Sequence, residues 1–95
     1  MLKVIKFYAT WCQSCKMLEP IFKNLKSKFN DVEFEEIDID QNNGKEMLAK
    51  FGGDTLPIIV VLKNNQAVET IRGVKPLITL EKKIKTIKGD EKETK

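Results

Sequence analysis

Two cysteines, Cys12 and Cys15, lie three positions apart, directly after a strand-like run and within the expected first turn of a helix. A thiol at a helix N-terminus is close to free backbone N–H groups and to the positive end of the helix dipole, and both favour the thiolate. A second thiol one turn further along can close a disulfide with the first. The spacing therefore predicts a pair that exchanges two electrons reversibly.

A metal site is the main alternative use of these cysteines. Structural zinc takes four ligands, whereas the chain has two cysteines and no histidine. A partner chain or carboxylates would have to supply the remaining ligands. We therefore expect redox chemistry and no bound metal.

Length and charge indicate one small domain that does not bind nucleic acid. The 95 residues, 41% of them hydrophobic, suffice for a core of modest size. The net charge of +3 is small, and basic residues are interleaved with acidic ones. No apolar run reaches the roughly 18 residues that a membrane span needs, and the first residues show no leader. We expect a monomer in the cytoplasm. In that reducing compartment a cysteine pair is usually catalytic or metal-binding rather than structural.

Hydrophobic periodicity alternates between strand and helix along the chain. The expected elements are strands over residues 2–8, 32–39, 57–63 and 67–72, and helices over 13–29, 44–51 and from Pro76 onward. A helix between the first two strands favours parallel pairing, and Asn64-Asn65 favours a hairpin between the last two. The simplest architecture is α/β, with helices packed on one mixed four-stranded sheet.

Local features refine this outline. Residues 2–8 are apolar on both faces, as in a central strand, whereas 32–39 is rich in acids, which is typical of an edge strand. Pro20 should kink the first helix. Residues 89–95 contain no apolar side chain. We therefore predict a domain over residues 1–88 and a flexible charged tail over 89–95.

Between about Val4 and Ile87 the chain resembles the thioredoxin superfamily. The residues that carry the likeness are Phe7-Tyr8-Ala9-Thr10-Trp11-Cys12-Gln13-Ser14-Cys15-Lys16, Pro20, Ile39-Asp40-Gln41-Asn42, Leu56-Pro57, Lys63-Asn64 and Gly73. The resemblance implies a thioredoxin-like fold with a minimal β-α-β-α-β-β-α core. The strand and helix that open full-length thioredoxin have no counterpart here.

The resemblance also implies an activity, thiol–disulfide exchange. Cys12 would be the exposed attacking thiol and Cys15 the resolving thiol. No cofactor is expected within the chain. Its partners would be proteins that contain disulfides and a recycling system, either a thioredoxin reductase or glutathione.

A substrate groove beside the cysteines is implied as well. In the family the bond that corresponds to Leu56–Pro57 is cis, and the backbone before the proline pairs with an extended substrate segment. Trp11 and Gly73 would border this groove. All four residues are therefore candidate substrate-binding residues.

Two departures from the family pattern concern the chemistry. Gln13-Ser14 replaces the usual Gly-Pro, so the reducing strength of thioredoxin does not carry over. Lys6 stands where the family has a buried aspartate, and Glu36 falls near the position of that aspartate's lysine partner. We hypothesise that Glu36, through water and steered by Lys6, deprotonates the resolving thiol. In the alternative interpretation the stem of Lys6 packs and its ammonium group reaches water.

Three other functions remain open from the sequence. The compact core also suits a glutaredoxin-like reductase recycled by glutathione, for example as an electron donor to ribonucleotide reductase. A second alternative is a peptide-binding module that keeps the groove but turns over slowly. A disulfide-forming oxidase is disfavoured because no export signal is visible. Trp11 before the first cysteine favours the thioredoxin-like reductase.

Overall fold

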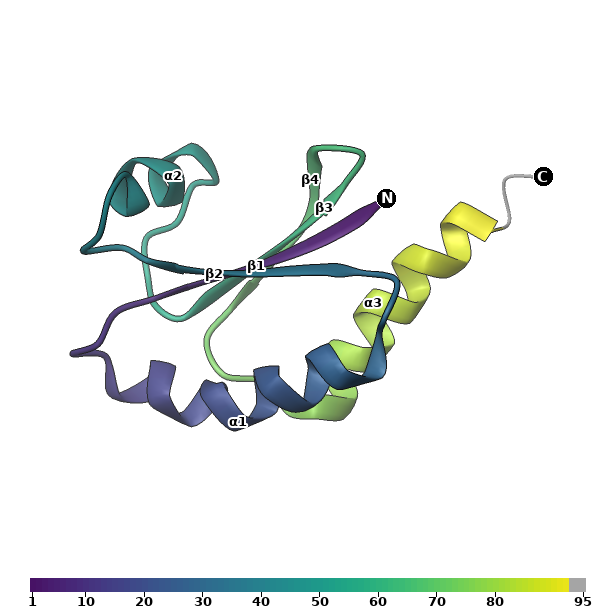
Figure 1. Cartoon of the computed structure of the whole chain (residues 1–95), viewed down its shortest axis with the longest axis horizontal. Coiled ribbons are helices and arrows are strands. Elements are labelled where there is room, and N and C mark those ends of the chain that lie inside the picture. Colours follow the sequence, from purple (N-terminus) through teal and green to yellow (C-terminus); the bar gives the residue numbers. More distant parts are fainter. Residues whose placement is uncertain (93–95) are drawn as a thin grey trace.

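The computed structural model describes residues 1–92, with side chains as far as Gly89. It contains the four strands and three helices that the periodicity predicts, in the predicted order (Figure 1). The elements are β1 (Leu2–Tyr8), α1 (Gln13–Lys28), β2 (Glu33–Asp38), α2 (Gly44–Lys50), β3 (Ile58–Lys63), β4 (Gln66–Arg72) and α3 (Leu77–Lys92).

The four strands form one mixed sheet in the order β2-β1-β3-β4. Strand β1 pairs in parallel with β2 and antiparallel with β3, and β3 pairs antiparallel with β4. The turn between β3 and β4 places Asn64 and Asn65 at φ 54° and 71°, a conformation that asparagine tolerates. The acid-rich β2 is an edge strand and the apolar β1 is central, as predicted.

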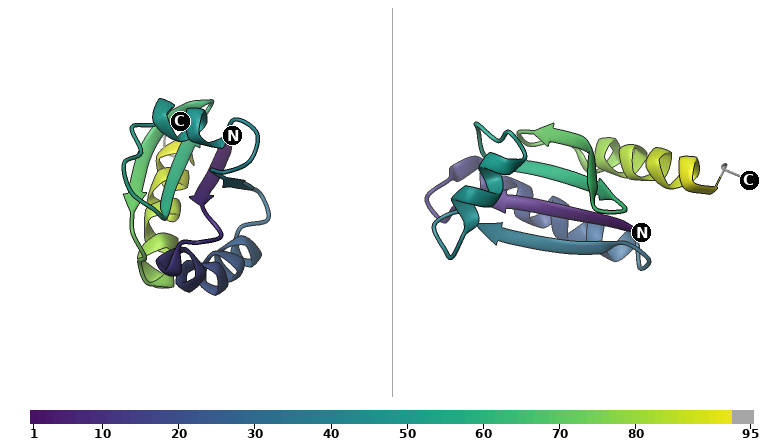
Figure 2. Two further views of the ribbon diagram at one scale, coloured as in Figure 1. Left: turned by 90° about the vertical axis from the view of Figure 1, so that its left-hand side faces the viewer. Right: turned by 90° about the horizontal axis from the view of Figure 1, so that it is seen from above.

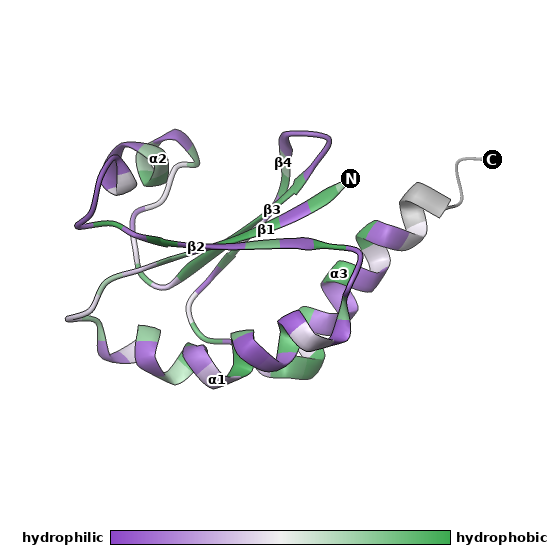
Figure 3. Ribbon diagram, in the orientation of Figure 1, coloured by the Kyte–Doolittle hydropathy of each residue, from purple (hydrophilic) through white to green (hydrophobic). Residues whose placement is uncertain are grey.

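Helices cover both faces of the sheet. Helices α1 and α3 lie on one face and α2 lies on the other (Figures 1 and 2). Leu18 and Phe22 of α1 and Ile84 of α3 pack in the larger core, whereas Phe7 and Ile58 belong to the core on the α2 side. Apolar residues concentrate along the central strands, whereas apolar and polar residues alternate along the helices (Figure 3). The sheet is therefore buried on both sides, and β1 carries the loop with the cysteines to one end of it.

The last helix is longer than predicted. Helix α3 continues through Lys92, across residues 89–92 that we expected to be tail. The apolar periodicity ends at Ile87, but no proline follows, and most residues after Ile87 have no strong preference against a helix. The rest of the predicted tail, residues 93–95, lies outside the described residues. None of the described helices combines the length and the hydrophobicity that a membrane span requires.

Candidate active site

Cys12 and Cys15 meet where the β1–α1 loop enters the helix. Cys12 is the N-cap residue of α1, and its Sγ accepts a hydrogen bond of 3.1 Å from the backbone N–H of Cys15. The two residues are joined in a disulfide, with their Cα atoms 5.2 Å apart. Cys12 is 7% exposed, so the expectation that its sulfur is exposed is wrong for the disulfide form, and Cys15 is more deeply buried at 2%. The sulfur of Cys12 therefore takes the place of the usual capping oxygen, where a negative charge is favoured.

A groove of about 390 Å³ opens beside Cys12. It lies between the loop that carries the cysteines and the loop that follows α2, and it is lined by Trp11, Cys12, Ile39, Leu48, Gly53, Asp54, Thr55 and Leu56. Trp11 and Leu56, which the resemblance assigned to substrate binding, are both among these residues. Most of the lining is apolar, so a bound segment would lose water next to the sulfur.

Asp40 holds Trp11 at the edge of this groove. Trp11 is 65% exposed, yet its Nε1–H donates a hydrogen bond of 2.7 Å to Oδ2 of Asp40. Asp40 belongs to a segment that carried the family resemblance, but sequence reasoning gave it no role. An exposed aspartate in a loop has no periodicity that would have indicated this contact.

Pro57 and Gly73 lie side by side, just beyond the lining of the groove. The Leu56–Pro57 peptide bond is cis, and the carbonyl of Pro57 accepts a hydrogen bond of 2.9 Å from the N–H of Gly73. Gly73 has φ 82°, a backbone conformation that suits glycine. This contact joins the start of β3 to the residue after β4.

Arg72 fixes the opposite wall of the groove, a contact that the sequence did not indicate. Its Nε–H donates to Oδ1 of Asp54 and its Nη2 donates to the carbonyl of Gly52, each over 3.3 Å. Both acceptors belong to the loop between α2 and β3. Arg72 therefore connects this loop to the end of β4.

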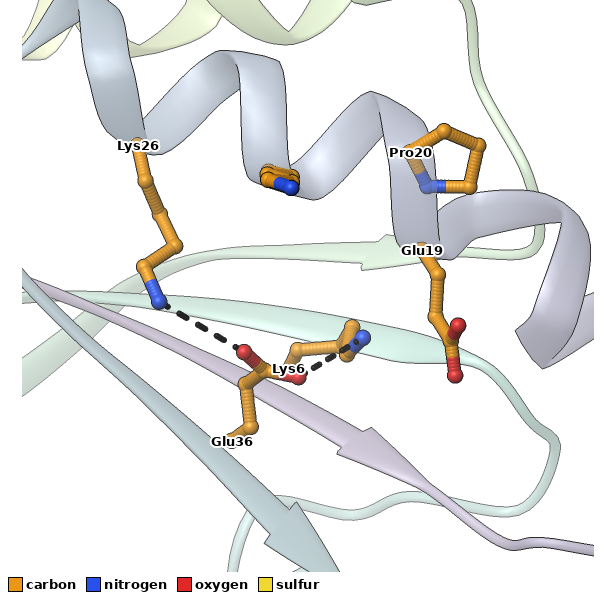
Figure 4. A pocket seen from close by; sticks show the side chains of 6 residues that line it. Lys6, Glu19, Pro20, Lys26 and Glu36 are labelled. Carbon is orange, nitrogen blue, oxygen red and sulfur yellow. Dashed lines mark ion pairs between the residues drawn. The ribbon is translucent and has the colours of Figure 1, made fainter.

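Lys6 and Glu36 form the charge-swapped pair that the family comparison suggested (Figure 4). They are partners in the β1–β2 register, and Lys6 Nζ lies 3.0 Å from Oε1 of Glu36. The Lys6 side chain is 1% exposed, and its ammonium lies 5.1 Å from the centre of the Phe22 ring and 5.2 Å from that of Tyr8. Lys26 of α1 contacts the other oxygen of Glu36 at 3.6 Å. The interpretation in which the Lys6 ammonium reaches water is therefore wrong.

This ion pair lines a second hollow, separate from the groove. The hollow is about 460 Å³ and is bounded by Lys6, Glu19, Pro20, Lys23, Lys26 and Glu36 (Figure 4). Within the described part of the chain, neither Lys6 nor Glu36 forms a hydrogen bond or ion pair with a cysteine. Burial, followed by the charges of Asp38, Glu36 and Glu19, raises the pKa of nearby Tyr8. Among the side chains that the structure describes, up to residue 89, there is no group of three from His, Cys, Asp or Glu placed to hold a metal ion.

Comparison with known proteins identifies the family. The family model "Thioredoxin" matches residues 1–86. The chain belongs to the thioredoxin family. Thioredoxin-1 of Schizosaccharomyces pombe is 36% identical over 75 residues, which cover 79% of this chain and 71% of that protein. Thioredoxin H8 of Arabidopsis thaliana is 45% identical over 74 residues, 78% of this chain but only 49% of that protein. The chain thus spans from about half to less than three quarters of the length of these curated thioredoxins.

Solved thioredoxins share the fold. The crystal structure of thioredoxin NaTrxh from Nicotiana alata aligns with a TM-score of 0.81 at 39% identity, covering 90% of this chain and 71% of that one. Mitochondrial thioredoxin 3 from Saccharomyces cerevisiae, in its oxidised form, aligns with a TM-score of 0.80 at 34% identity. This alignment covers 90% of this chain and 77% of that one. These alignments confirm the predicted thioredoxin-like α/β fold.

Proposed function

We propose that this thioredoxin-family chain is a thiol–disulfide oxidoreductase that reduces disulfides in other proteins. The observation that carries the proposal is the position of Cys12 Sγ, which lies at the helix N-terminus, accepts a backbone hydrogen bond and borders an apolar groove. Helix N-termini lower the pKa of thiols in Cys-X-X-Cys motifs, to about 7 in thioredoxin. A thiolate of that kind is both abundant and nucleophilic at neutral pH.

The reaction transfers two electrons in two displacements. Cys12 thiolate attacks one sulfur of the substrate disulfide, a mixed disulfide forms, and the other substrate sulfur leaves as a thiolate that takes up a proton. Cys15, once deprotonated, attacks Cys12 Sγ and releases the second substrate thiolate. The substrate gains two electrons and two protons, and the Cys12–Cys15 disulfide remains, as seen in the structure.

A recycling system must then return the chain to its dithiol form. Supply of electrons by a thioredoxin reductase, or alternatively by glutathione, is part of the proposal, as is a monomeric state in a reducing compartment such as the cytoplasm. All cysteines of the chain belong to the redox pair, which leaves none for structural disulfides. Structural disulfides are the usual feature of oxidising compartments.

The role proposed for Glu36 is to accept the proton of Cys15 through water, with Lys6 holding its carboxylate in place. Glu36→Gln should shift the pH dependence of the second displacement to higher pH and slow that step at neutral pH. Glu35→Gln is the matched control, because Glu35 lies on the same strand and pairs with Lys3 at 2.7 Å. Equal pH profiles for Glu36→Gln and the wild type would exclude this role.

Insulin reduction with dithiothreitol tests the function itself. The wild type should accelerate precipitation of the insulin chains, and Cys12→Ser should reduce the rate to that of dithiothreitol alone. A Cys12→Ser variant as fast as the wild type would overturn the proposal. If the chain is instead a peptide-binding module with little turnover, it should bind peptides, and neither the wild type nor Cys12→Ser should accelerate insulin reduction. Replacing dithiothreitol by thioredoxin reductase with NADPH, or by glutathione with its reductase, then identifies the recycling system.

A further inference from the structure

Ser14, the second residue of α1, lies between two groups of the groove. Its Oγ is 3.5 Å from Cys12 Sγ and 3.4 Å from the carbonyl oxygen of Leu56, to which it donates a hydrogen bond. A serine hydroxyl carries a single proton and therefore donates to one acceptor at a time. The charge on Cys12 Sγ determines whether the hydroxyl donates to this sulfur or to the Leu56 carbonyl.

In the disulfide form the carbonyl is the stronger acceptor. The bridged sulfur of Cys12 carries neither a proton nor a charge, whereas an amide oxygen is a good acceptor. Leu56 lies outside the strands, and among the described residues Ser14 provides the only hydrogen bond to its carbonyl. The carbonyl is therefore occupied while Cys12 and Cys15 are joined.

Reduction reverses this preference. Two electrons and two protons convert the disulfide to two thiols, and above the pKa of Cys12 one of these protons is lost from its sulfur. Hydrogen bonds to an ionised acceptor are about twice as strong as those between neutral groups. A rotation of the Ser14 hydroxyl directs its proton to the thiolate without any movement of the backbone.

We propose that Ser14 is a redox-dependent hydrogen-bond switch, bonded to the Leu56 carbonyl in the disulfide form and to Cys12 Sγ in the thiolate form. The inference rests on the proposed function, because it assigns Ser14 a part in the same exchange. It has two consequences. The thiolate gains a donor in addition to the backbone N–H of Cys15, and the Leu56 carbonyl becomes free to accept a peptide N–H in the groove of the reduced protein, which is the form that attacks substrate.

Two variants separate this role from a structural one. Ser14→Ala removes the donor and keeps a good helix former. Ser27→Ala is the matched control, since Ser27 is also on α1 and also donates to a backbone carbonyl, that of Asn24 at 2.7 Å, but lies near the far end of the helix. The charged residues that the structure connects to the surroundings of Cys12 are Asp54 in the groove wall, Asp40 bonded to Trp11, and Lys16, whose backbone N–H donates to the Cys12 carbonyl. Both variants retain all three.

The measurement is the equilibrium of the Cys12–Cys15 couple with glutathione as a function of pH, together with titration of the Cys12 thiolate by its ultraviolet absorbance. Ser14→Ala should lower the acid dissociation constant of Cys12 about tenfold, which raises its pKa by about one unit. Near pH 9, about two units above the pKa of about 7 that thiols in Cys-X-X-Cys motifs reach, the equilibrium constant for reduction should fall nearly tenfold, or about 30 mV. Near pH 6, below that pKa, the thiol should be mostly neutral in both proteins, so this difference should vanish. Ser27→Ala should follow the wild type throughout.

The pH dependence decides the outcome. A Ser14→Ala variant that equals the wild type at both pH values, or differs from it equally at both, would overturn the switch, because a purely structural contact has no reason to act on the thiolate alone. The titration needs no protein substrate. Failure to reduce insulin would therefore overturn the proposed function, while the Ser14 result would still stand or fall by this equilibrium.

Discussion

The indole N–H of Trp11, which lines the groove beside Cys12, donates to Oδ2 of Asp40 over 2.7 Å. Asp40 is itself held in place, because its backbone N–H donates to Oδ1 of Asp38 at the end of β2. A hydrogen bond to a carboxylate is stronger than one between neutral groups. The bond to Asp40 therefore fixes the exposed ring of Trp11, which would otherwise sample several rotamers.

Asp40→Ala should release Trp11. We expect faster decay of the fluorescence anisotropy, which is easy to assign because Trp11 is the only tryptophan. The KM for insulin should rise severalfold, and the free energy of unfolding should change by less than about 1 kcal/mol because the site is exposed. Glu46→Ala is the control, since Glu46 lines the neighbouring hollow with Asp40 but does not bond Trp11. Unchanged anisotropy in Asp40→Ala would show that packing alone orients the ring.

The Lys6–Glu36 pair predicts that removing the anion lowers the free energy of unfolding more than removing the cation does. Glu36→Gln leaves the buried ammonium of Lys6 without its anion, which should cost about 2 kcal/mol, less than for a fully buried pair because Glu36 is 40% exposed. Lys6→Met replaces the cation by an apolar side chain and leaves Glu36 paired with Lys26 at the surface. Urea unfolding of each variant measures the two costs. If Lys6→Met were the more destabilising change, the pair would be a net stabilising contact and this account would be wrong.

The sequence predicted this pair only in part. The family resemblance placed Lys6 near Glu36. Whether the ammonium reached water depended on α1, which covers Lys6 with Phe22 and supplies Lys26 as a second cation for Glu36. A strand pattern contains no information about the helix packed above it.

Other polar contacts of the site were beyond sequence reasoning for a similar reason. Strand and helix positions follow from apolar periods that recur along the chain, so they were predictable to within a few residues. Arg72 and Asp54 are 18 positions apart and meet through the path of one loop. Ser14 reaches Leu56 across 42 positions. Such contacts depend on the conformation of loops, and loops have no apolar periodicity from which it could be predicted.

Two glycines should respond to alanine in opposite ways. A Cβ on Gly44 would overlap the carbonyl oxygen of Asp38 and come within 2.6 Å of the Cα of Ile39, both backbone atoms. Gly89 lies within α3 with no atom near its added Cβ. We expect Gly44→Ala to lower the free energy of unfolding by about 2 kcal/mol or more, and Gly89→Ala to raise it by up to about 1 kcal/mol. Chemical denaturation tests both, and a neutral Gly44→Ala would mean that β2 and α2 can separate at little cost.

Tyr8 makes stability depend on alkaline pH. Burial raises its pKa above the usual 10.0, and Asp38, Glu36 and Glu19 raise it further. The folded state therefore holds the phenol proton more tightly than the unfolded chain does. This contribution to stability is complete below about pH 10 and is lost as the pH rises through the folded-state pKa.

Ultraviolet titration can follow Tyr8 alone, because it is the only tyrosine. We expect a midpoint above 10 that moves down in Asp38→Asn and stays in place in Glu33→Gln, whose carboxylate is on the same strand but does not act on Tyr8. Tyr8→Phe should remove this part of the alkaline loss of stability. A midpoint at or below the ordinary value in the wild type would contradict the burial of the phenol.

The Arg72–Asp54 contact predicts a change in substrate affinity with only a small change in stability. Arg72 holds the loop that forms one wall of the groove, at Gly52 and at Asp54. Arg72→Ala should increase amide hydrogen exchange at residues 53–56 and raise the KM for insulin severalfold, with kcat nearly unchanged. The free energy of unfolding should fall by no more than about 1 kcal/mol, because the pair is exposed. Lys83→Ala is the control, since Lys83 pairs with Glu69 of β4 at the same 3.3 Å but away from the groove. If both variants changed KM equally, the effect would come from β4 as a whole and not from the loop that Arg72 holds.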